Sequence, residues 1–314
     1  MQDFEEAQCP ICQSRDYEII TNKSMFEIFV NFSLCKSCGF GYLNPRWTSK
    51  RYMQYYTEEY DNHYRIPELS GKAKFWAKYN GIVEIIERLK FHETMPENVS
   101  NILDIGAGMG WYLEYLKKNK FENASLWAIE PSKGCQENFG HLGINLLTED
   151  VDENWHLNFE GKFDFIIMRH VLEHFLDPIG VLQKVSYVLK EGGILYVGLP
   201  SFDNPNQPIT KDFIRVAHVN YFTELSLTNS FLMSGLAPIF SVNYSPTNYH
   251  ELYSIARKTG ICIKPFVSKG EYLKSKELIT KKMDEENSPV FLYKQAIERR
   301  YKKYKKILRQ YFHN

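Results

Sequence analysis

The stretch Asn101-Ile-Leu-Asp104-Ile-Gly106-Ala-Gly108-Met-Gly110 decides the fold of this chain. The apolar residues before the glycines predict a buried parallel strand, and the periodic segment after them predicts a helix. Glycines between a strand and a helix let backbone N–H groups approach a ligand closely, because glycine has no Cβ. The sequence therefore predicts an α/β sheet with a ligand-binding turn at its carboxyl edge.

Two details of this turn indicate which ligand it holds. The spacing is G-x-G-x-G, and Trp111 stands where the third glycine of a dinucleotide-binding turn would fall. Asp104 lies at the end of the strand, where its carboxylate would repel a pyrophosphate but attract an ammonium group. S-adenosylmethionine carries an ammonium and a sulfonium group and no phosphate. The turn therefore favours S-adenosylmethionine over NAD.

Further motifs follow in a recognisable order. Glu130 ends the apolar run 125–129, where a carboxylate can accept hydrogen bonds from both hydroxyls of a ribose. Residues 162–168 predict a fourth strand, and Glu191-Gly-Gly193 leads into a fifth. In this order the motifs resemble the class I S-adenosylmethionine-dependent methyltransferases over roughly residues 80–258.

The resemblance implies an α/β fold, with a seven-stranded, doubly wound, Rossmann-like sheet, an N-terminal zinc ribbon and a helical C-terminal tail. The last two strands are expected at 238–242 and 251–256 as an antiparallel pair. The expected divisions are a zinc ribbon at 1–48, a helical linker or cap at 49–98, a methyltransferase core at 99–260 and a basic helical extension at 261–314.

Residues that match the family motifs are expected to hold S-adenosylmethionine. Asp104 and the glycines would bind the methionine half and Glu130 the ribose. In the resembled family an acidic residue near the end of strand three meets the adenine; we choose Asp150 over Glu149, and a solvated turn is the alternative. Arg169 lies where strand four meets the cofactor but departs from the usual small or polar residue, which leaves its role open. The expected cofactor-binding residues are Asp104, Gly106, Gly108, Gly110, Glu130, Asp150, Arg169 and Tyr56.

Tyr56 belongs to a tyrosine-rich segment, 50–60, that predicts an amphipathic helix with its tyrosines on one face. One interpretation is a helix that packs on the main domain. Similar ribbon-bearing methyltransferases carry a comparable helix, which implies that Tyr56 or Tyr60 caps the methionine end of the cofactor.

Four of the six cysteines form two C-x-x-C pairs with 22 residues between them. This spacing is typical of a four-thiolate zinc ribbon, with a small hairpin over 17–20 and 26–30 between the pairs. Four thiolates leave no open position for water, so the zinc would be structural. Unpaired or disulfide-bonded cysteines are the alternative. The expected zinc ligands are Cys9, Cys12, Cys35 and Cys38.

The stretch His170-Val-Leu-Glu173-His174 follows the fourth strand. It matches the inverted zincin pattern H-x-x-E-H, but that chemistry needs a site well inside a helix and a third ligand downstream. Here the stretch opens at the carboxyl edge of the sheet, and on a short helix its three polar residues would share one face. It resembles the hVLEHxxDP segment of small-molecule methyltransferases, including those of surface-polysaccharide gene clusters and the ubiquinone O-methyltransferases. In them such groups brace the active-site wall, and one histidine can serve as the base.

A Pro- and Asn-rich loop at 198–208 leads to Ala217-His218-Val-Asn-Tyr221-Phe-Thr223, which resembles a lid element whose histidine faces the site. Thr223 with Ser226 predicts the N-cap of the next helix. His218 or His174 could take a proton from an acceptor hydroxyl, since the pKa of histidine lies near neutrality. The alternative is a hydrogen-bonded lid histidine that only positions the acceptor. The expected catalytic residues are His218, His174 and Tyr221, with Tyr221 orienting the substrate.

Composition limits the class of protein and its location. A length of 314 residues with 44% hydrophobic residues suits a globular protein of one large domain with additions, or of two domains. The N-terminus is acidic and polar, so no signal peptide is expected, and no run of 18 apolar residues predicts a membrane span. The paired cysteines suit a reducing compartment, so we expect a cytoplasmic protein.

The net charge is zero but unevenly distributed. Residues 261–314 hold 14 Lys and Arg against 6 Asp and Glu, a net charge of +8 that the rest of the chain balances. A basic helix with an apolar stripe is expected over 290–312. It would pack on the domain or on a dimer partner, with peripheral attachment to an anionic membrane as the alternative. Nucleic acid is not an expected partner, because no recognition module accompanies the charge.

The sequence therefore predicts methyl transfer from S-adenosylmethionine by direct displacement at the sulfonium methyl. The ribbon, the His-Val-Leu-Glu-His string and the lid together resemble methyltransferases of bacterial surface-glycan or secondary-metabolite pathways. That resemblance implies a small-molecule acceptor, first a sugar hydroxyl that is free, nucleotide-linked or in a glycan. O-methylation of a quinone or phenol precursor is the second hypothesis. Methylation of RNA or protein, gripped by the ribbon and basic tail, is a third.

Overall fold

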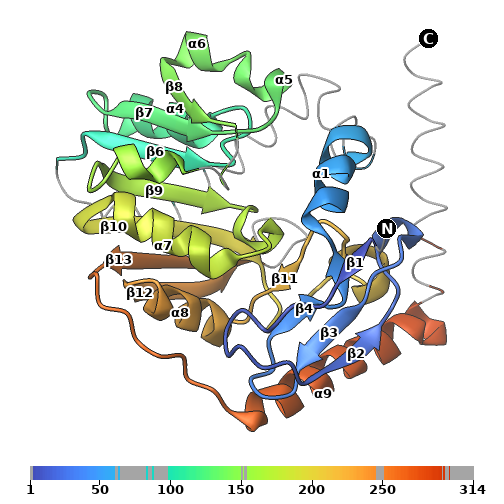
Figure 1. Cartoon of the computed structure of the whole chain (residues 1–314). Helices are drawn as coiled ribbons and strands as arrows, with labels where there is room; N and C mark the ends of the chain where they lie inside the picture. Colours follow the sequence, from blue (N-terminus) through green and yellow to red (C-terminus); the bar gives the residue numbers. More distant parts are fainter. Residues whose placement is uncertain are drawn as a thin grey trace, which may run out of the picture.

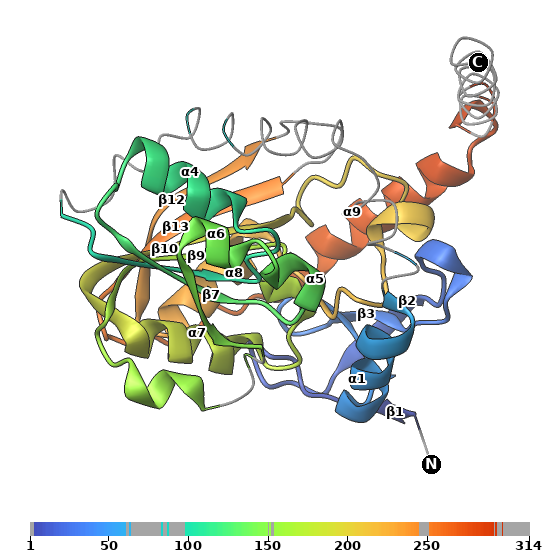
Figure 2. The ribbon, with the colours of Figure 1, turned by 90° about the horizontal axis from the view of Figure 1, so that it is seen from above.

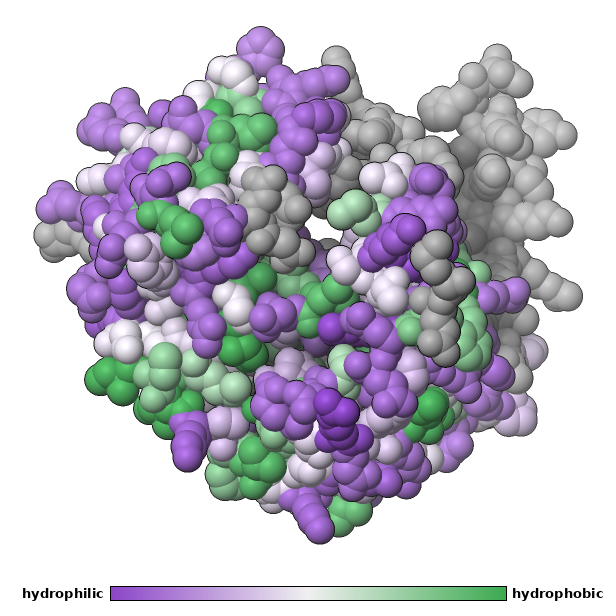
Figure 3. Space-filling view, viewed as in Figure 1, coloured by the Kyte–Doolittle hydropathy of each residue, from purple (hydrophilic) through white to green (hydrophobic). Residues whose placement is uncertain are grey.

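The structure is a computed structural model that describes residues 3–60, 63, 83, 87, 98–149, 151, 154–244, 251–291, 293 and 297. A large α/β lobe is joined to a smaller lobe that contains the N-terminal strands, α1 (Ser49–Glu58) and α9 (Lys269–Asn287) (Figure 1). The surface is hollowed between the two lobes (Figure 3).

Seven strands form the sheet of the large lobe: β6 (Asn101–Ile105), β7 (Ser125–Ile129), β8 (Ile144–Thr148), β9 (Phe163–Arg169), β10 (Leu189–Pro200), β12 (Leu236–Tyr244) and β13 (Glu251–Lys258). Their order is β12-β13-β10-β9-β6-β7-β8. The five strands from β10 to β8 pair in parallel, whereas β13 is antiparallel to both β10 and β12. The predicted seven-stranded sheet and its antiparallel last pair are confirmed.

Each face of this sheet has its own core. Its main covering helices are α4 (Trp111–Asn119), α7 (Pro178–Val188) and α8 (Glu224–Met233). Ile166 and Met168 of β9 pack with α7 and α8, while Phe165 and Ile167, which alternate with them along the strand, pack with α4. Figure 2 shows α4 and α7 on opposite sides of the sheet. Because both faces are covered, the central strands are continuous apolar runs.

The chain enters α8 through a capping box. Thr223 Oγ1 accepts a hydrogen bond from the Ser226 N–H, and Ser226 Oγ accepts one from the Thr223 N–H. The predicted N-cap is therefore confirmed. It fixes the point at which the loop that carries His218 ends.

The N-terminal segment contributes three strands to a second sheet, of order β11-β4-β3-β2. Its strands are β2 (Tyr17–Thr21), β3 (Phe32–Cys35), β4 (Gly41–Leu43) and β11 (Asn220–Tyr221). The hairpin arm predicted at 26–30 is wrong. Phe26 lies in the short helix η1 (Met25–Glu27) with a left-handed backbone, and Phe26 and Phe29 are exposed, so their alternation does not mark a buried strand. The fourth strand, β11, belongs to the segment 214–223 that carries His218 and is called the lid loop below, so this segment completes the sheet of the N-terminal strands.

The helix α1 confirms the prediction for the tyrosine-rich segment. Tyr52 and Tyr55 are buried in a third apolar cluster, with Trp47, Phe213 and residues of the second sheet. The Tyr52 O–H donates a hydrogen bond to the Val216 carbonyl at 3.1 Å, which ties α1 to the lid loop. The interpretation of a packed helix therefore holds for Tyr52 and Tyr55.

The helix α9 lies within 261–314, where a helical extension is expected, although its own bounds were not predicted. Lys276 Nζ lies 2.8 Å from Glu18 Oε2 of β2, and Glu286 accepts hydrogen bonds from the backbone and side chain of Thr210. Most of the basic helix predicted at 290–312, most of the linker predicted at 49–98, and Asp150 lie outside the described residues. In the part of the chain that the structure describes, no helix is long and apolar enough to cross a membrane.

The remaining elements are short: β1 (Phe4–Glu5), β5 (Arg46–Trp47), α5 (Lys133–Gln136), α6 (Phe139–Leu142), η4 (Trp155–Asn158), η5 (Leu172–His174) and η6 (Ile209–Phe213). The strands β1 and β5 form a separate two-stranded pair. Of these elements, η5 carries residues of the candidate site, because it directly follows the carboxyl end of β9.

Candidate active site

The glycine turn after β6 has a backbone that requires glycine. Gly106 has a φ of +74°, and a Cβ there would lie 2.3 Å from Cγ2 of Val171. The turn thus packs against the segment that follows β9. Gly108 has a φ of +54°, and none of the described residues lies within 4 Å of the position of its Cβ. A ligand can therefore approach the backbone closely at Gly108.

Asp104 and Glu130 end the adjacent strands β6 and β7, and both side chains are buried. Burial, with the neighbouring Glu130 charge as the second cause, raises the pKa of Asp104 well above its usual value. Glu130 is held by the N–H groups of Gly108 and Ser132, which donate to its Oε2 and Oε1 at 2.8 Å each. The turn therefore presents one carboxyl group suited to a cation and one carboxylate that is already oriented.

Replacing Glu130 with Gln is expected to weaken the binding of S-adenosylhomocysteine. The amide removes the charge and turns an N–H group toward a backbone N–H. A hydrogen bond to a charged group contributes about 1.5–3 kcal/mol, so the affinity should fall roughly 10- to 150-fold. Isothermal titration calorimetry measures the change. Glu137→Gln, an exposed residue beside the same turn, is the control, and an unchanged affinity in Glu130→Gln would remove Glu130 from the cofactor site.

Arg169, which the sequence analysis placed among the cofactor-binding residues, ends β9 and pairs with Glu251 at the start of β13. Its Nη2 lies 2.8 and 3.0 Å from the two carboxylate oxygens, and the Tyr253 O–H donates to the same carboxylate. Although burial opposes it, His170 and Arg169 hold the pKa of Glu251 well below its usual range. Glu251 thus neutralises the charge of Arg169 in the wall of the site, and a contact of Arg169 with the cofactor stays a prediction.

His170 has a left-handed backbone, with a φ of +54°. It precedes η5, so the expectation that His170, Glu173 and His174 share one helix is wrong for His170. Its imidazole nevertheless bridges two carboxylates, with Nε2 3.2 Å from Glu251 Oε1 and Nδ1 3.5 Å from Glu173 Oε1. Although burial opposes it, Glu251 raises the pKa of His170 above its usual value. Such a strained residue is typical of a functional edge.

The two histidines predicted as catalytic lie together at this edge. The rings of His174 and His218 are nearly perpendicular, with centroids 4.9 Å apart. The Val219 N–H donates to the Glu173 carbonyl at 2.8 Å, which holds the lid loop against η5. Burial lowers the pKa of His174, and burial with His174 nearby lowers that of His218 much further, so both rings are neutral near pH 7.

Glu173 completes a cluster with these histidines. One carboxylate oxygen of Glu173, one ring nitrogen of His174 and one ring nitrogen of His218 all lie within 4.8 Å of one another. The Glu173 side chain is buried, and its carboxylate oxygens accept no hydrogen bond within the described ranges. Tyr56 O–H and His174 Nδ1 are joined by a hydrogen bond of 3.2 Å, so the tyrosine helix reaches the same cluster.

Tyr221 corrects the sequence analysis, which gave it the task of orienting the substrate. Its hydroxyl accepts a hydrogen bond from the Arg215 N–H and donates one to the Arg215 carbonyl, at 3.0 and 3.2 Å. The side chain is buried, because Phe32 and Phe213 pack against its ring. Tyr221 therefore closes the loop that carries His218, and we no longer assign it a contact with the acceptor.

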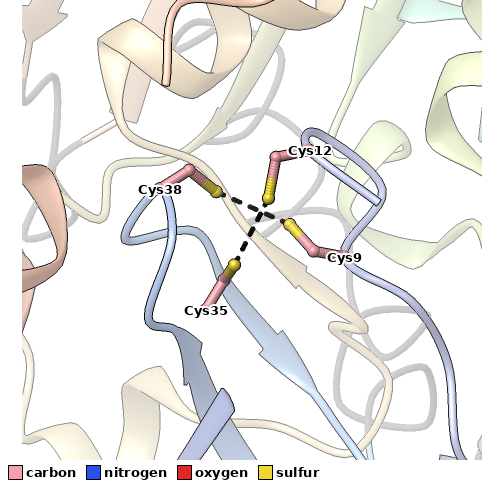
Figure 4. A group of neighbouring side chains, drawn as sticks. All are labelled: Cys9, Cys12, Cys35 and Cys38. Carbon is pink, nitrogen blue, oxygen red and sulfur yellow. Dashed lines mark hydrogen bonds between the residues drawn. The ribbon is translucent and has the colours of Figure 1, made fainter. Parts of the chain in front are cut away.

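The four predicted zinc ligands converge in the smaller lobe (Figure 4). Sγ of Cys9 lies 3.6 Å from Sγ of Cys38, and Sγ of Cys12 lies 3.4 Å from Sγ of Cys35. Thiolates around a tetrahedral zinc are about 3.8 Å apart, which follows from a Zn–S distance near 2.3 Å. The donor set and its spacing therefore fit zinc.

Glu251 is the site residue that the sequence analysis missed. It was included only as the first residue of the last strand. A charged residue opening an apolar strand is a weak signal, and its partner Arg169 is 82 positions away in the sequence. Only the antiparallel pairing of β13 with β10, and the parallel pairing of β10 with β9, bring the two to the same edge.

Comparisons with known proteins agree with this geometry. A curated relative is the mitochondrial ubiquinone biosynthesis O-methyltransferase of Dictyostelium discoideum, 23% identical over 148 residues, which are 43% of this chain and 44% of that protein. The chain thus matches less than half the length of that relative. A solved structure, the Burkholderia thailandensis 1,6-didemethyltoxoflavin-N1-methyltransferase with S-adenosylhomocysteine bound, superposes with a TM-score of 0.52 at 18% identity and covers 70% of this chain and 95% of its own.

That likeness shows the fold of the large lobe. The model of the methyltransferase-domain family matches residues 75–239, which is more than half of the chain and includes the glycine turn and both histidines. The predicted class of enzyme is therefore confirmed: this chain belongs to the methyltransferase-domain family, and its large lobe is an S-adenosylmethionine-dependent methyltransferase domain.

Proposed function

We propose that this protein transfers the methyl group of S-adenosylmethionine to a hydroxyl group of a small molecule. The observation that carries the proposal is the packing of Gly106 against Val171, which makes the glycine turn adjacent to the segment of Glu173 and His174. Cofactor and acceptor groups on the same edge can bring the methyl group and the attacking oxygen into line.

Each cofactor group has a proposed partner in this site. Asp104 receives the ammonium group, the backbone around Gly108 approaches the methionine half, and Glu130 accepts hydrogen bonds from the ribose hydroxyls. Asp150 for the adenine is proposed from the family resemblance alone. His174 and His218, both buried and neutral, contact the acceptor hydroxyl, and Tyr56 fixes the ring of His174 through its hydrogen bond.

We propose a sugar hydroxyl as the first acceptor class. The motifs shared with methyltransferases of surface-glycan pathways support it, and so does the cluster of polar side chains, which suits a polyhydroxylated ligand. A quinone or phenol precursor is the second candidate, and the similarity to the ubiquinone biosynthesis enzyme favours it.

Labelled S-adenosylmethionine tests these proposals. The purified protein is incubated with host extract, which is then separated into nucleotide-sugar, lipid, RNA and protein fractions. Label in nucleotide sugars or lipid-linked saccharides supports the sugar acceptor, and label in a quinone precursor supports the second candidate. Label confined to RNA or protein would overturn both small-molecule proposals and make the ribbon the recognition surface.

Replacing His218 with Ala is expected to lower kcat about 100-fold or more while leaving the affinity for S-adenosylhomocysteine within about twofold. The reason is that loss of a group that contacts the reacting hydroxyl affects the chemical step. Radiometric assays and calorimetry measure the two effects. His141→Ala on α6, whose side chain is exposed, is the control, and wild-type turnover in His218→Ala would remove it from the acceptor site.

Zinc, location and partners complete the proposal. We propose that Cys9, Cys12, Cys35 and Cys38 hold a structural zinc, and that the four thiols place the protein in the reducing cytoplasm. Peripheral membrane contact through 290–312, and association of two copies through that segment, are proposals that rest on the sequence. Sedimentation of the protein with anionic vesicles, with and without residues 290–314, tests the membrane contact.

A further inference from the structure

The spacing within the cluster of Glu173, His174 and His218 indicates what it surrounds. His174 Nε2 lies 4.0 Å from Glu173 Oε1, and the three donor atoms are within 4.8 Å of one another. Ligands of a tetrahedral zinc are about 3.4 Å apart, because each is about 2.1 Å from the ion. Three groups that each make a hydrogen bond of about 2.8 Å to one central oxygen are about 4.8 Å apart. At 4.0 Å the pair of His174 and Glu173 is wider than two ligands of one tetrahedral zinc, and the whole cluster is no wider than three groups around one hydrogen-bonded oxygen.

The hydrogen-bonding needs of the three groups point the same way. Both carboxylate oxygens of Glu173 are buried, and within the described ranges they accept no hydrogen bond. His170 Nδ1 lies 3.5 Å from Glu173 Oε1, which places a charge nearby but forms no hydrogen bond. Among the described residues, the carboxylate therefore lacks the donor that a buried carboxylate requires. A carboxylate only accepts, whereas a neutral imidazole can donate one N–H. A hydroxyl group satisfies both, because it donates its own proton and accepts another.

Glu173 is also held firmly in place. Its backbone carbonyl accepts the Val219 N–H, so η5 and the lid loop move together. Behind it, His170 is fixed by Glu251, which in turn is held by Arg169 and Tyr253. This chain of alternating charges spans three strands of the large sheet and ends at the Glu173 carboxylate. The backbone of Glu173 is therefore fixed, and His170 restrains the direction of its carboxylate.

We infer that Glu173, His174 and His218 bind the acceptor hydroxyl, and that Glu173 is the catalytic residue that accepts its proton. This inference rests on the proposed function and assigns the base to the carboxylate rather than to a histidine. The hydroxyl oxygen forms a bond to the methyl carbon, and the carbon–sulfur bond breaks with its electron pair passing to sulfur. The O–H proton passes to Glu173, which later releases it to water. One imidazole N–H donates a hydrogen bond to a lone pair of the oxygen, which leaves its other lone pair free to attack the methyl carbon, and the second imidazole lies beside the oxygen.

The test compares Glu173→Gln, Glu173→Asp and wild-type protein. Acceptors are dTDP-rhamnose, dTDP-glucose, 3,4-dihydroxybenzoate and host extract, assayed with labelled S-adenosylmethionine. Glu173→Gln should lower kcat about 100-fold or more, with KM and the affinity for S-adenosylhomocysteine within about threefold of wild type. Glu173→Asp keeps a carboxylate at a longer distance and should recover part of the lost rate. Glu137→Gln is the matched control.

Four results would overturn the inference, and they are distinguishable. Turnover of Glu173→Gln within threefold of wild type would exclude Glu173 as the base while leaving the proposed function in place. If Glu173→Gln fails to bind S-adenosylhomocysteine, a Glu173→Asp variant that binds it but shows no recovered rate does the same. Titration with Co²⁺ that detects a second bound ion, lost in Glu173→Gln, would make the cluster a metal site. Wild-type protein that labels no acceptor would overturn the proposed function and this inference together.

Discussion

Replacing Asp104 with Asn is expected to weaken the binding of S-adenosylhomocysteine about 10- to 100-fold and at the same time to stabilise the ligand-free protein. The affinity falls because the neutral amide no longer attracts the ammonium group of the cofactor. The stability rises because a carboxyl group in this buried position beside Glu130 ionises at a cost. Calorimetry and thermal unfolding measure the two effects.

The pH dependence of this effect has a definite sign. The pKa of Asp104 is raised in the folded protein, whereas in the unfolded chain it lies near 3.8. Between those two values the folded state binds more protons, so stability falls as pH rises. The stabilisation by Asp104→Asn should therefore be small near pH 4 and increase toward pH 7. A variant that is equally destabilised at every pH would contradict this account.

Asp164 is a matched control on the same sheet. It is also buried, but its Oδ2 accepts the N–H groups of Ser100 and Asn101 at 2.9 Å, and its Oδ1 accepts Lys190 Nζ at 2.6 Å. Asp164→Asn should therefore destabilise the protein and leave the affinity for S-adenosylhomocysteine almost unchanged. Stability should rise in Asp104→Asn and fall in Asp164→Asn. This difference distinguishes a carboxyl group that binds a ligand from one that stabilises the fold.

Replacing Cys35 with Ser is expected to release the zinc and to unfold the ribbon. Zinc binding in small ribbons and fingers contributes about 10–16 kcal/mol to their folding, so the loss of the ion is expected to outweigh the packing of the segment around the four thiols. Cys9, Cys35 and Phe40 are buried in the same core as Phe222 of the lid. The zinc content, by a chromogenic chelator, and the melting temperature are the measurements, and we also expect kcat to fall with the zinc.

Cys262→Ser is the control for this variant, because Cys262 is exposed and lies outside the cluster. It should retain one zinc per chain and the wild-type melting temperature. If Cys35→Ser kept both, the four thiols would not form a structural metal site. Cobalt in place of zinc should give the intense charge-transfer absorption of a four-thiolate site in the wild type only.

The central strands of the large lobe, such as β6 and β9, could be predicted because they are apolar runs that are buried on both faces. The strand β7 has the bounds that the apolar run 125–129 predicted, and β13 begins at residue 251 as predicted. The predicted arm at 26–30 failed because its phenylalanines are exposed rather than alternating toward a core. A helical extension was expected over 261–314, but the bounds of α9 were not predicted, because its mixed charges hide a short buried face around Ile279.

The residues of the candidate site could be predicted only where a local sequence motif indicates their role. Asp104 and the glycines belong to one turn, Glu130 ends the next strand along the chain, and the structure brings them together. His174 and His218 were expected from separate motifs, and it is the Val219 hydrogen bond to Glu173 that joins them. The contact between Arg169 and Glu251, and the use of the Tyr221 hydroxyl within its own loop, depend on tertiary packing and leave no local pattern.

The shared second sheet has a consequence for how this enzyme can be modified. The strand β11, which lies two residues after His218, pairs with β4 of the ribbon. Exchanging residues 1–48 between relatives would therefore not swap an independent module, because the graft would have to rebuild the hydrogen bonds that hold the acceptor loop. A chimaera should inherit its acceptor preference from the donor of the ribbon and lid together, and either part transplanted alone should give a protein that binds the cofactor but turns over poorly.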